Sequence, residues 1–177
     1  MTQAWDGVVV AKGSTVVYVG NVPAGTPDSR LFNLTNTGNA TLTITNPTTL
    51  VSGANWSEIV TPVATLAPGA TTSVRVRILS STGGTFTGTV SISSNDTANN
   101  PFTFSVQATV DPPPAPNVQV SRAWDGVNVS KGSTVVYVGN VPAGTSDSRL
   151  FNLTNTGNAT LNLSNPNTLV SGANWYL

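Results

Sequence analysis

Few residues in this sequence could carry acid–base or nucleophilic chemistry. It has seven carboxylates, no histidine and no cysteine. Two carboxylates facing each other across a cleft suffice for glycoside hydrolysis, but no specific pair stands out here. The commonest general base and metal ligand, histidine, is missing, and so are thiolate nucleophiles and thiolate metal sites. The sequence therefore predicts a protein that is not an enzyme and holds no cofactor.

One loop collects side chains that could bind a metal ion. Residues 93–101 read SSNDTANNP and contain Asn95, Asp96, Asn99 and Asn100. Oxygen ligands of this kind can hold Ca²⁺, although a single carboxylate is poor for a divalent ion. The alternative is a turn whose backbone is capped by these side chains. We favour the capped turn and expect no metal site.

Four tryptophans occur in two repeated contexts. Trp5 and Trp124 stand in AWDG, whereas Trp56 and Trp175 stand in GANW. Exposed aromatic rings could stack on a sugar or anchor an interface. They could equally pack in a core or cover the open edge of a sandwich. For Trp5 and Trp124 we leave an interdomain contact and core packing open, and we take Trp5, Trp124 and Trp175 as interface candidates.

Composition excludes two classes of partner. The chain has 177 residues, of which 38% are hydrophobic and 8% charged, and its formal net charge is zero. Without a basic stripe to neutralise phosphates, we expect no nucleic-acid binding. No apolar run reaches the ~18 residues of a membrane-spanning helix, so we expect no membrane insertion. No signal peptide is visible at the start of the sequence either.

The sequence repeats itself. A shift of 119 residues aligns residues 4–56 with residues 123–175, and seven of these 53 positions differ, which leaves 46 identities. Such similarity indicates a recent tandem duplication. We therefore predict a first repeat at 1–110, a proline-rich linker at 111–117 (DPPPAPN) and an incomplete second repeat at 118–177. The second copy stops where the first still has about half of its length to run.

Alternation with a period of two predicts short strands throughout. The clearest case is 73–79, where Val74, Val76 and Ile78 should point inward while Arg75 and Arg77 point outward. Further strands are expected at 8–10, 15–19, 30–36, 40–46, 87–93 and 102–108. The Asn-Thr-Gly-Asn stretch at 36–39 predicts a tight hairpin turn between two of them. Many short strands with frequent turns favour an all-β, antiparallel two-sheet sandwich.

The order of these motifs resembles a known family. FNLTNTGNATLTI, LAPGATTSVRVRI, GTFTGTVSISSND and NPFTFSVQATV follow one another, as in choice-of-anchor D or Hydin-like immunoglobulin-like domains. The resemblance covers residues 8–110, and 118–175 match its first half. It implies an immunoglobulin-like β-sandwich, favours a core position for Trp56, and brings no catalytic motif. Bacterial relatives of this kind are tandem modules of secreted or surface-anchored proteins, whereas eukaryotic relatives occur in ciliary and centrosomal proteins.

Half a sandwich cannot bury its inward face. In the second copy this face comprises Phe151, Leu153, Leu161 and Leu163. Exposing four such side chains costs several kcal/mol at about 25 cal/mol per Å². Three outcomes are open: a fragment of a longer array, completion by strands of another molecule, or disorder. With Trp5, Trp124 and Trp175, these four residues complete our set of interface candidates.

The sequence thus favours a structural function over chemistry. We expect a repeat module of an extracellular or cell-surface fibre whose partners are other copies of itself, joined by strand complementation or tandem stacking. The alternative is an adhesive module that recognises glycan or protein through loop aromatics. A cytosolic scaffold of the ciliary type is a third class.

Overall fold

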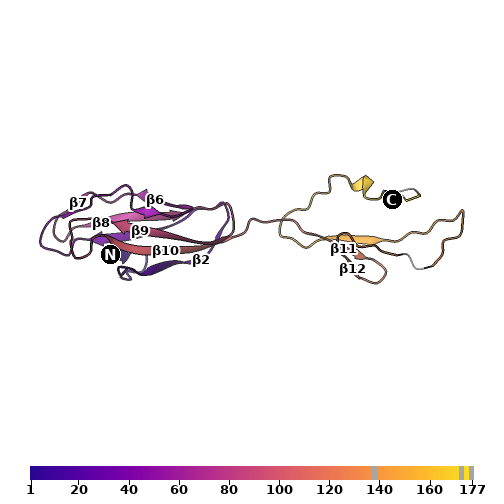
Figure 1. Cartoon of the computed structure of the whole chain (residues 1–177), viewed down its shortest axis with the longest axis horizontal. Coiled ribbons are helices and arrows are strands. Elements are labelled where there is room, and N and C mark those ends of the chain that lie inside the picture. Colours follow the sequence, from indigo (N-terminus) through magenta and orange to yellow (C-terminus); the bar gives the residue numbers. More distant parts are fainter. Residues whose placement is uncertain (137–138, 172–173, 176–177) are drawn as a thin grey trace. The chain divides into compact units, whose positions relative to one another are not determined.

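The computed structural model describes residues 1–136, 139–171 and 174–175. These residues contain thirteen strands, one 3₁₀ turn (η1, Pro166–Thr168) and no α-helix. The chain divides into two compact units, Met1–Pro113 and Pro114–Leu177 (Figure 1). The all-β sandwich predicted from the sequence is confirmed.

Two four-stranded sheets make up the first unit. One has the order β1 (Thr2–Gln3), β3 (Asp28–Thr35), β8 (Thr71–Ile78) and β6 (Trp56–Val60). The other has the order β2 (Thr15–Pro23), β10 (Phe102–Asp111), β9 (Gly84–Ile92) and β5 (Val51–Ser52). Two short strands, β4 (Leu42–Thr43) and β7 (Thr65–Leu66), form a separate pair. All pairs are antiparallel except β2 with β10, which run parallel.

The alternation read in the sequence positions the core. Val74, Val76 and Ile78 on β8 are buried, while Arg75 between them is exposed, as predicted. Because successive side chains of a strand face opposite ways, each strand gives one row to the space between the sheets. The buried hydrophobic residues are Val10, Val16, Tyr18, Val22, Phe32, Ile44, Leu50, Trp56, Leu66, Val74, Val76, Ile78, Val90, Ile92, Phe104, Val106, Ala108 and Val110. All of them belong to the first unit.

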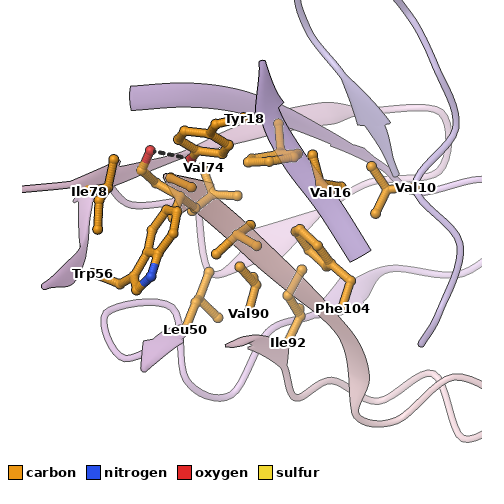
Figure 2. Packing of buried hydrophobic residues seen from close by; sticks show 14 of the residues in the cluster. Val10, Val16, Tyr18, Leu50, Trp56, Val74, Ile78, Val90, Ile92 and Phe104 are labelled. Atoms are coloured by element: carbon orange, nitrogen blue, oxygen red, sulfur yellow. Dashed lines mark hydrogen bonds between the residues drawn. The ribbon is translucent and has the colours of Figure 1, made fainter. Parts of the chain in front are cut away.

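Aromatic rings from the two sheets contact one another in this core (Figure 2). Phe32 of β3 meets Phe104 of β10 with ring centroids 5.2 Å apart. Tyr18 of β2 lies edge-on to Trp56 of β6 at 5.2 Å and 88°. The Tyr18 hydroxyl also donates a hydrogen bond of 2.8 Å to the backbone carbonyl of Val76. The core position favoured for Trp56 is therefore confirmed, because only 7% of this residue is exposed.

Two local expectations were wrong. The turn at 36–39 is not a hairpin, because β3 pairs with β8 and β4 pairs with β7. The Asn36 side chain closes this turn instead, since it accepts from Gly38 N–H and donates to the carbonyl of Ala40. Residues 8–10 do not form a strand either; only Val9 makes an isolated bridge, to Thr2. Both segments cross between sheets, and local alternation does not show which sheet a segment joins.

The second unit contains one three-stranded sheet in the order β12 (Asn128–Val129), β11 (Val118–Arg122) and β13 (Phe151–Asn155). Strand β11 pairs with β13 over five residues, and Arg122 lies opposite Phe151. In the first unit Gln3 lies opposite Phe32, which is the same register 119 residues earlier. The linker predicted at 111–117 begins inside β10, which ends at Asp111.

Candidate assembly surface of the second unit

A tryptophan on a tight turn begins each copy. In the first, Asp6 accepts a hydrogen bond from Val8 N–H (2.9 Å), and Gly7 N–H bonds the carbonyl of Gln3 (3.0 Å). Gly7 has a φ of 73°, a conformation that favours glycine. This turn holds Trp5 edge-on against Phe32, with centroids 5.5 Å apart at 76°.

An arginine lies beside this tryptophan. The guanidinium of Arg30 is 5.8 Å from the ring centre of Trp5 and 4.8 Å from that of Tyr18, distances typical of cation–π contacts. Arg30 also pairs with Asp28 on the same strand. Burial raises the pKa of the Tyr18 hydroxyl well above its usual range, and Arg30 only partly opposes this shift. Tyr18 therefore acts as a neutral hydrogen-bond donor inside the core.

The second copy repeats the aspartate-capped turn and the contact between tryptophan and phenylalanine, but a different arginine lies beside the tryptophan. Trp124 meets Phe151 edge-on at 5.4 Å and 74°. Arg122, at the position that Gln3 has in the first copy, stacks on Trp124 at 5.5 Å and pairs with Asp125. The counterpart of Arg30, Arg149, pairs with Asp147 as Arg30 does with Asp28. Asp125 also accepts from Val127 N–H (3.1 Å), as Asp6 does from Val8.

The two corner tryptophans are therefore neither core residues nor free platforms. Trp5 is 44% exposed and Trp124 43%, and each makes a T-shaped contact with a phenylalanine. A cavity of about 610 Å³ lies beside Trp124. Its lining includes Arg122, Asp125, Arg149 and Leu150.

The inward faces of the two copies differ in burial. Ile44 is 2% exposed, and its counterpart Leu163 is 44% exposed. Trp56 is 7% exposed, whereas Trp175 is 56% exposed. Leu153 is also exposed, and Phe151 and Leu161 are half-buried. Phe151, Leu163 and Trp175 thus present apolar surface that the first unit buries at Phe32, Ile44 and Trp56. The counterparts of Leu153 and Leu161, Leu34 and Leu42, are themselves only half-buried at the margin of the first core.

Among the described residues, two strand pairings of the first unit have no equivalent in the second copy. Strand β3 has a neighbour on each side, β1 and β8, whereas β13 pairs with β11 alone among the described strands. Residues 134–142 repeat the sequence of β2, TVVYVGNVP. Their described members, 134–136 and 139–142, form no strand.

A buried asparagine was missed in reading the sequence. Asn36 is 6% exposed, and besides closing its turn it donates a hydrogen bond of 3.0 Å to the carbonyl of Leu66. Asn155 closes the equivalent turn by bonding Gly157 N–H and the Ala159 carbonyl, but it is exposed. The Asn-Thr-Gly repeated in both copies is the signal that could have found it.

The loop at 93–101 forms the capped turn favoured above. One carboxylate oxygen of Asp96 accepts from Ala98 N–H (3.1 Å), and the other accepts from the Asn99 side chain (2.8 Å). The Asn99 hydrogen bond lowers the pKa of Asp96. Asn100 accepts from Ser94 N–H. Within the described residues, no three His, Cys, Asp or Glu side chains group as metal ligands would.

No helix among the described residues has the length and apolar character needed to cross a membrane. A search of curated proteins returns no match to the sequence.

Solved structures that are similar to part of the chain include the following three. The ASH/PapD-like domain 7 of human CEP192 matches with a TM-score of 0.45 and 8% identity, covering 57% of this chain and 83% of that one. The VesB protease of Vibrio cholerae matches with a TM-score of 0.38 and 20% identity, over 57% of this chain and 31% of that one. The secreted serine protease VesC of Vibrio cholerae matches with 0.37 and 19%, over 58% and 22%.

The sequence profile of one domain family matches residues 13–109, which is just over half of the 177-residue chain. These residues run from the start of β2 almost to the end of β10 and include nearly all of the buried core. The chain therefore belongs to the HYDIN/CFA65/VesB-like family of immunoglobulin-like domains.

Proposed function

We propose that this chain is a structural repeat module that builds or spaces an extracellular or cell-surface fibre. One observation carries the proposal: residues 4–56, the front half of the sandwich, recur at 123–175 with 46 of 53 positions identical. Both copies make the same contact between tryptophan and phenylalanine and the same strand register. Near-identical units joined by a short stiff linker suit repetition along a line. The partners we propose are further units of the same sequence, joined by strand complementation or tandem stacking.

Immunogold labelling of the source cells tests this placement. Antibodies against the first unit should label fibres on intact, unpermeabilised cells, and gold particles should recur along each fibre. A control serum depleted on the purified chain should give no label. Labelling that requires permeabilisation would overturn the proposal and would favour an intracellular scaffold.

An adhesive role is a second candidate, because Trp5 and Trp124 are both partly exposed and each lies beside an arginine. An aromatic ring next to a guanidinium can bind the apolar face and the hydroxyls of a sugar. A glycan array compares the chain with its Trp5→Ala/Trp124→Ala variant. Glycan binding that this variant loses would favour adhesion, whereas the fibre proposal expects no glycan signal from either chain.

A further inference from the structure

The Asn-Thr-Gly-Asn turn of the second copy, residues 155–158, contacts the chain segment that leads into that copy. Two backbone N–H groups of the turn bond residues that precede the start of β11. Thr156 N–H donates to the carbonyl of Asn117 (2.8 Å), and Asn158 N–H donates to that of Ala115 (3.1 Å). The segment therefore continues the line of β11 along the turn, in residues that the sequence predicted to be linker.

The turn also accepts hydrogen bonds from the same segment. The side-chain oxygen of Asn158 accepts from Ala115 N–H (2.9 Å), and that of Asn155 accepts from Asn117 N–H (3.2 Å). The Asn117 side chain donates a further bond of 3.0 Å to the Thr156 hydroxyl. Ala115 and Asn117 thus each use both backbone groups on the turn, as paired residues of two antiparallel strands do.

The two prolines of this segment stand where no donor is needed. Pro114 and Pro116 alternate with Ala115 and Asn117, and proline has no N–H group. In a strand, proline is tolerated at positions whose N–H would not join a ladder. The Pro-Ala-Pro-Asn sequence therefore offers backbone donors only at the two residues that the turn binds.

Gly157 lets the segment approach this closely. A Cβ at Gly157 would lie 2.5 Å from the backbone nitrogen of Asn117 and 2.7 Å from the carbonyl carbon of Pro116. It would also meet the carbonyl oxygen of Ala115. The φ of Gly157 lies outside the left-handed region, so the turn itself does not require glycine. The need for glycine comes from the bound segment.

The first copy supplies a matched control for this glycine. Its turn at 36–39 has the same four residues, and the φ of Gly38 also lies outside the left-handed region. A Cβ at Gly38 would meet Asn36 Oδ1 at 3.3 Å, within the turn itself. The two glycines thus share sequence and backbone region, and only a Cβ at Gly157 collides with linker backbone.

We propose that the turn at 155–158 is a binding site for an extended Pro-x-Pro-Asn segment, which residues 114–117 supply. Gly157 leaves room for the backbone of this segment, and Asn155 and Asn158 provide its acceptors. Residues 114–117 then fold with the second unit, which begins at Pro114, instead of serving as a spacer. The inference goes beyond the proposed function, because it holds wherever the protein is located.

Amide exchange measured by NMR on the full 177-residue chain tests the proposal. The N–H groups of Ala115 and Asn117 should exchange about tenfold slower than in a free peptide of residues 111–118, because a hydrogen bond must open first. Equal rates in the chain and in the peptide would overturn the proposal.

The two glycines show whether this protection depends on the fit. Gly157→Ala should bring the Ala115 and Asn117 amides to the rates of the free peptide. Gly38→Ala should leave both amides as slow as in the original chain. Protection that survives Gly157→Ala would overturn the proposal, since the segment would then not lie against this glycine.

A second pair of variants separates loss of the segment from loss of the turn. Asn155 closes the turn through Gly157 and Ala159, so changes at Asn158 leave that closure in place. Asn158→Ala removes the acceptor of Ala115 N–H, and this amide should exchange at the peptide's rate while the β11 amides paired with β13 keep theirs.

Asn158→Asp keeps an oxygen at the same position and should keep the Ala115 amide slow. Equal Ala115 rates in the alanine and aspartate variants would overturn the proposal. These outcomes do not depend on where immunogold places the protein, so the linker site and the fibre proposal can fail separately.

Discussion

Strand β2 and residues 134–142 carry the same nine residues, but the described residues of the second segment, 134–136 and 139–142, have a different structure. In the first unit they form a strand that buries Val16, Tyr18 and Val22 against β10. In the second unit the described residues form no strand, and Val141, the counterpart of Val22, is 47% exposed. The comparison shows that this sequence becomes a strand through its neighbour, as expected when strand propensity depends on packing.

Features made within residues 4–56 recur within residues 123–175. The asparagine turn, the aspartate-capped AWDG turn and the edge-on tryptophan recur with similar geometry. Features that need residues 57–110 occur only in the first unit. Residues 4–56, the front half of the repeat, thus specify their own turns and the contact between tryptophan and phenylalanine. Residues 57–110, the back half, supply the burial that stabilises a domain.

The largest difference between the copies should appear on truncating the central phenylalanine. Phe32→Ala should lower the free energy of unfolding of the first unit by about 3–5 kcal/mol, because Phe32 is fully buried between β8 and Phe104. Phe151→Ala should leave that transition where it is. Urea titration followed by circular dichroism measures both, with Phe32→Leu as a milder variant should Phe32→Ala fail to fold. Equal losses would mean that the second copy is packed as the first is.

The buried asparagine should give the next largest contrast. Asn36→Ala removes hydrogen bonds to Gly38, Ala40 and Leu66, and it should cost the first unit about 1–3 kcal/mol. The corresponding Asn155→Ala removes a solvent-exposed turn bond and should leave the first unit's midpoint unchanged. The same urea titration checks the pair. A neutral Asn36→Ala would show that the Leu66 carbonyl does not need this donor.

Gly88 tests whether the burial of Trp56 depends on the back half. A Cβ at Gly88 would lie 2.7 Å from Cγ of Trp56, so Gly88→Ala should cost roughly 1–3 kcal/mol by overpacking. Leucine in place of Trp56 removes the indole atoms that the new Cβ would meet. The loss of stability caused by Gly88→Ala should therefore be smaller in a Trp56→Leu background. Thermal unfolding of the four chains of this cycle gives the coupling. Additive effects would contradict the close contact between β9 and Trp56.

The smallest effect concerns Glu58, whose position in the second copy is Leu177. One oxygen of Glu58 accepts from Leu50 N–H, the other is buried without a hydrogen-bond partner, and desolvation raises the pKa above its ordinary 4.5. A carboxyl with a raised pKa binds its proton more tightly when folded. Its contribution to stability is thus full below pH 4.5 and is lost as pH rises through the folded pKa.

Glu58→Gln removes this dependence. The free energy of unfolding of the variant minus that of the original chain should therefore rise with pH from below 4.5 to 7. Urea midpoints across that range provide the measurement. A difference that is flat in pH, or that falls, would show that Glu58 is not desolvated in the first unit.

Much of the fold could be read from the sequence, and the reasons are local. The inward row of β8 follows from the alternation of Val74, Val76 and Ile78 with two arginines. The pairing of strands could not be read this way. The turn at 36–39 carries hairpin residues, yet its flanking strands pair with the distant β8 and β7.

The candidate surface was harder to read than the core. Asn36 stands among many asparagines of a Thr- and Asn-rich chain, so composition hides the one that is buried. Trp5 makes its T-shaped contact with Phe32, which is 27 positions away in the sequence. The spacing of the two residues alone does not indicate that they meet. The repeat, in contrast, could be read directly, and it is what makes the two copies comparable.

Hydrogen exchange of the unmodified chain tests the central claim most directly. The account predicts that the β2 amides bonded to β10 exchange only when the first unit opens, while residues 134–136 and 139–142 exchange at rates near those of an unfolded peptide. Fragments that extend to Val9 or Asn128 distinguish the two copies. Equal, slow exchange in both would contradict the claim that the back half orders the front half.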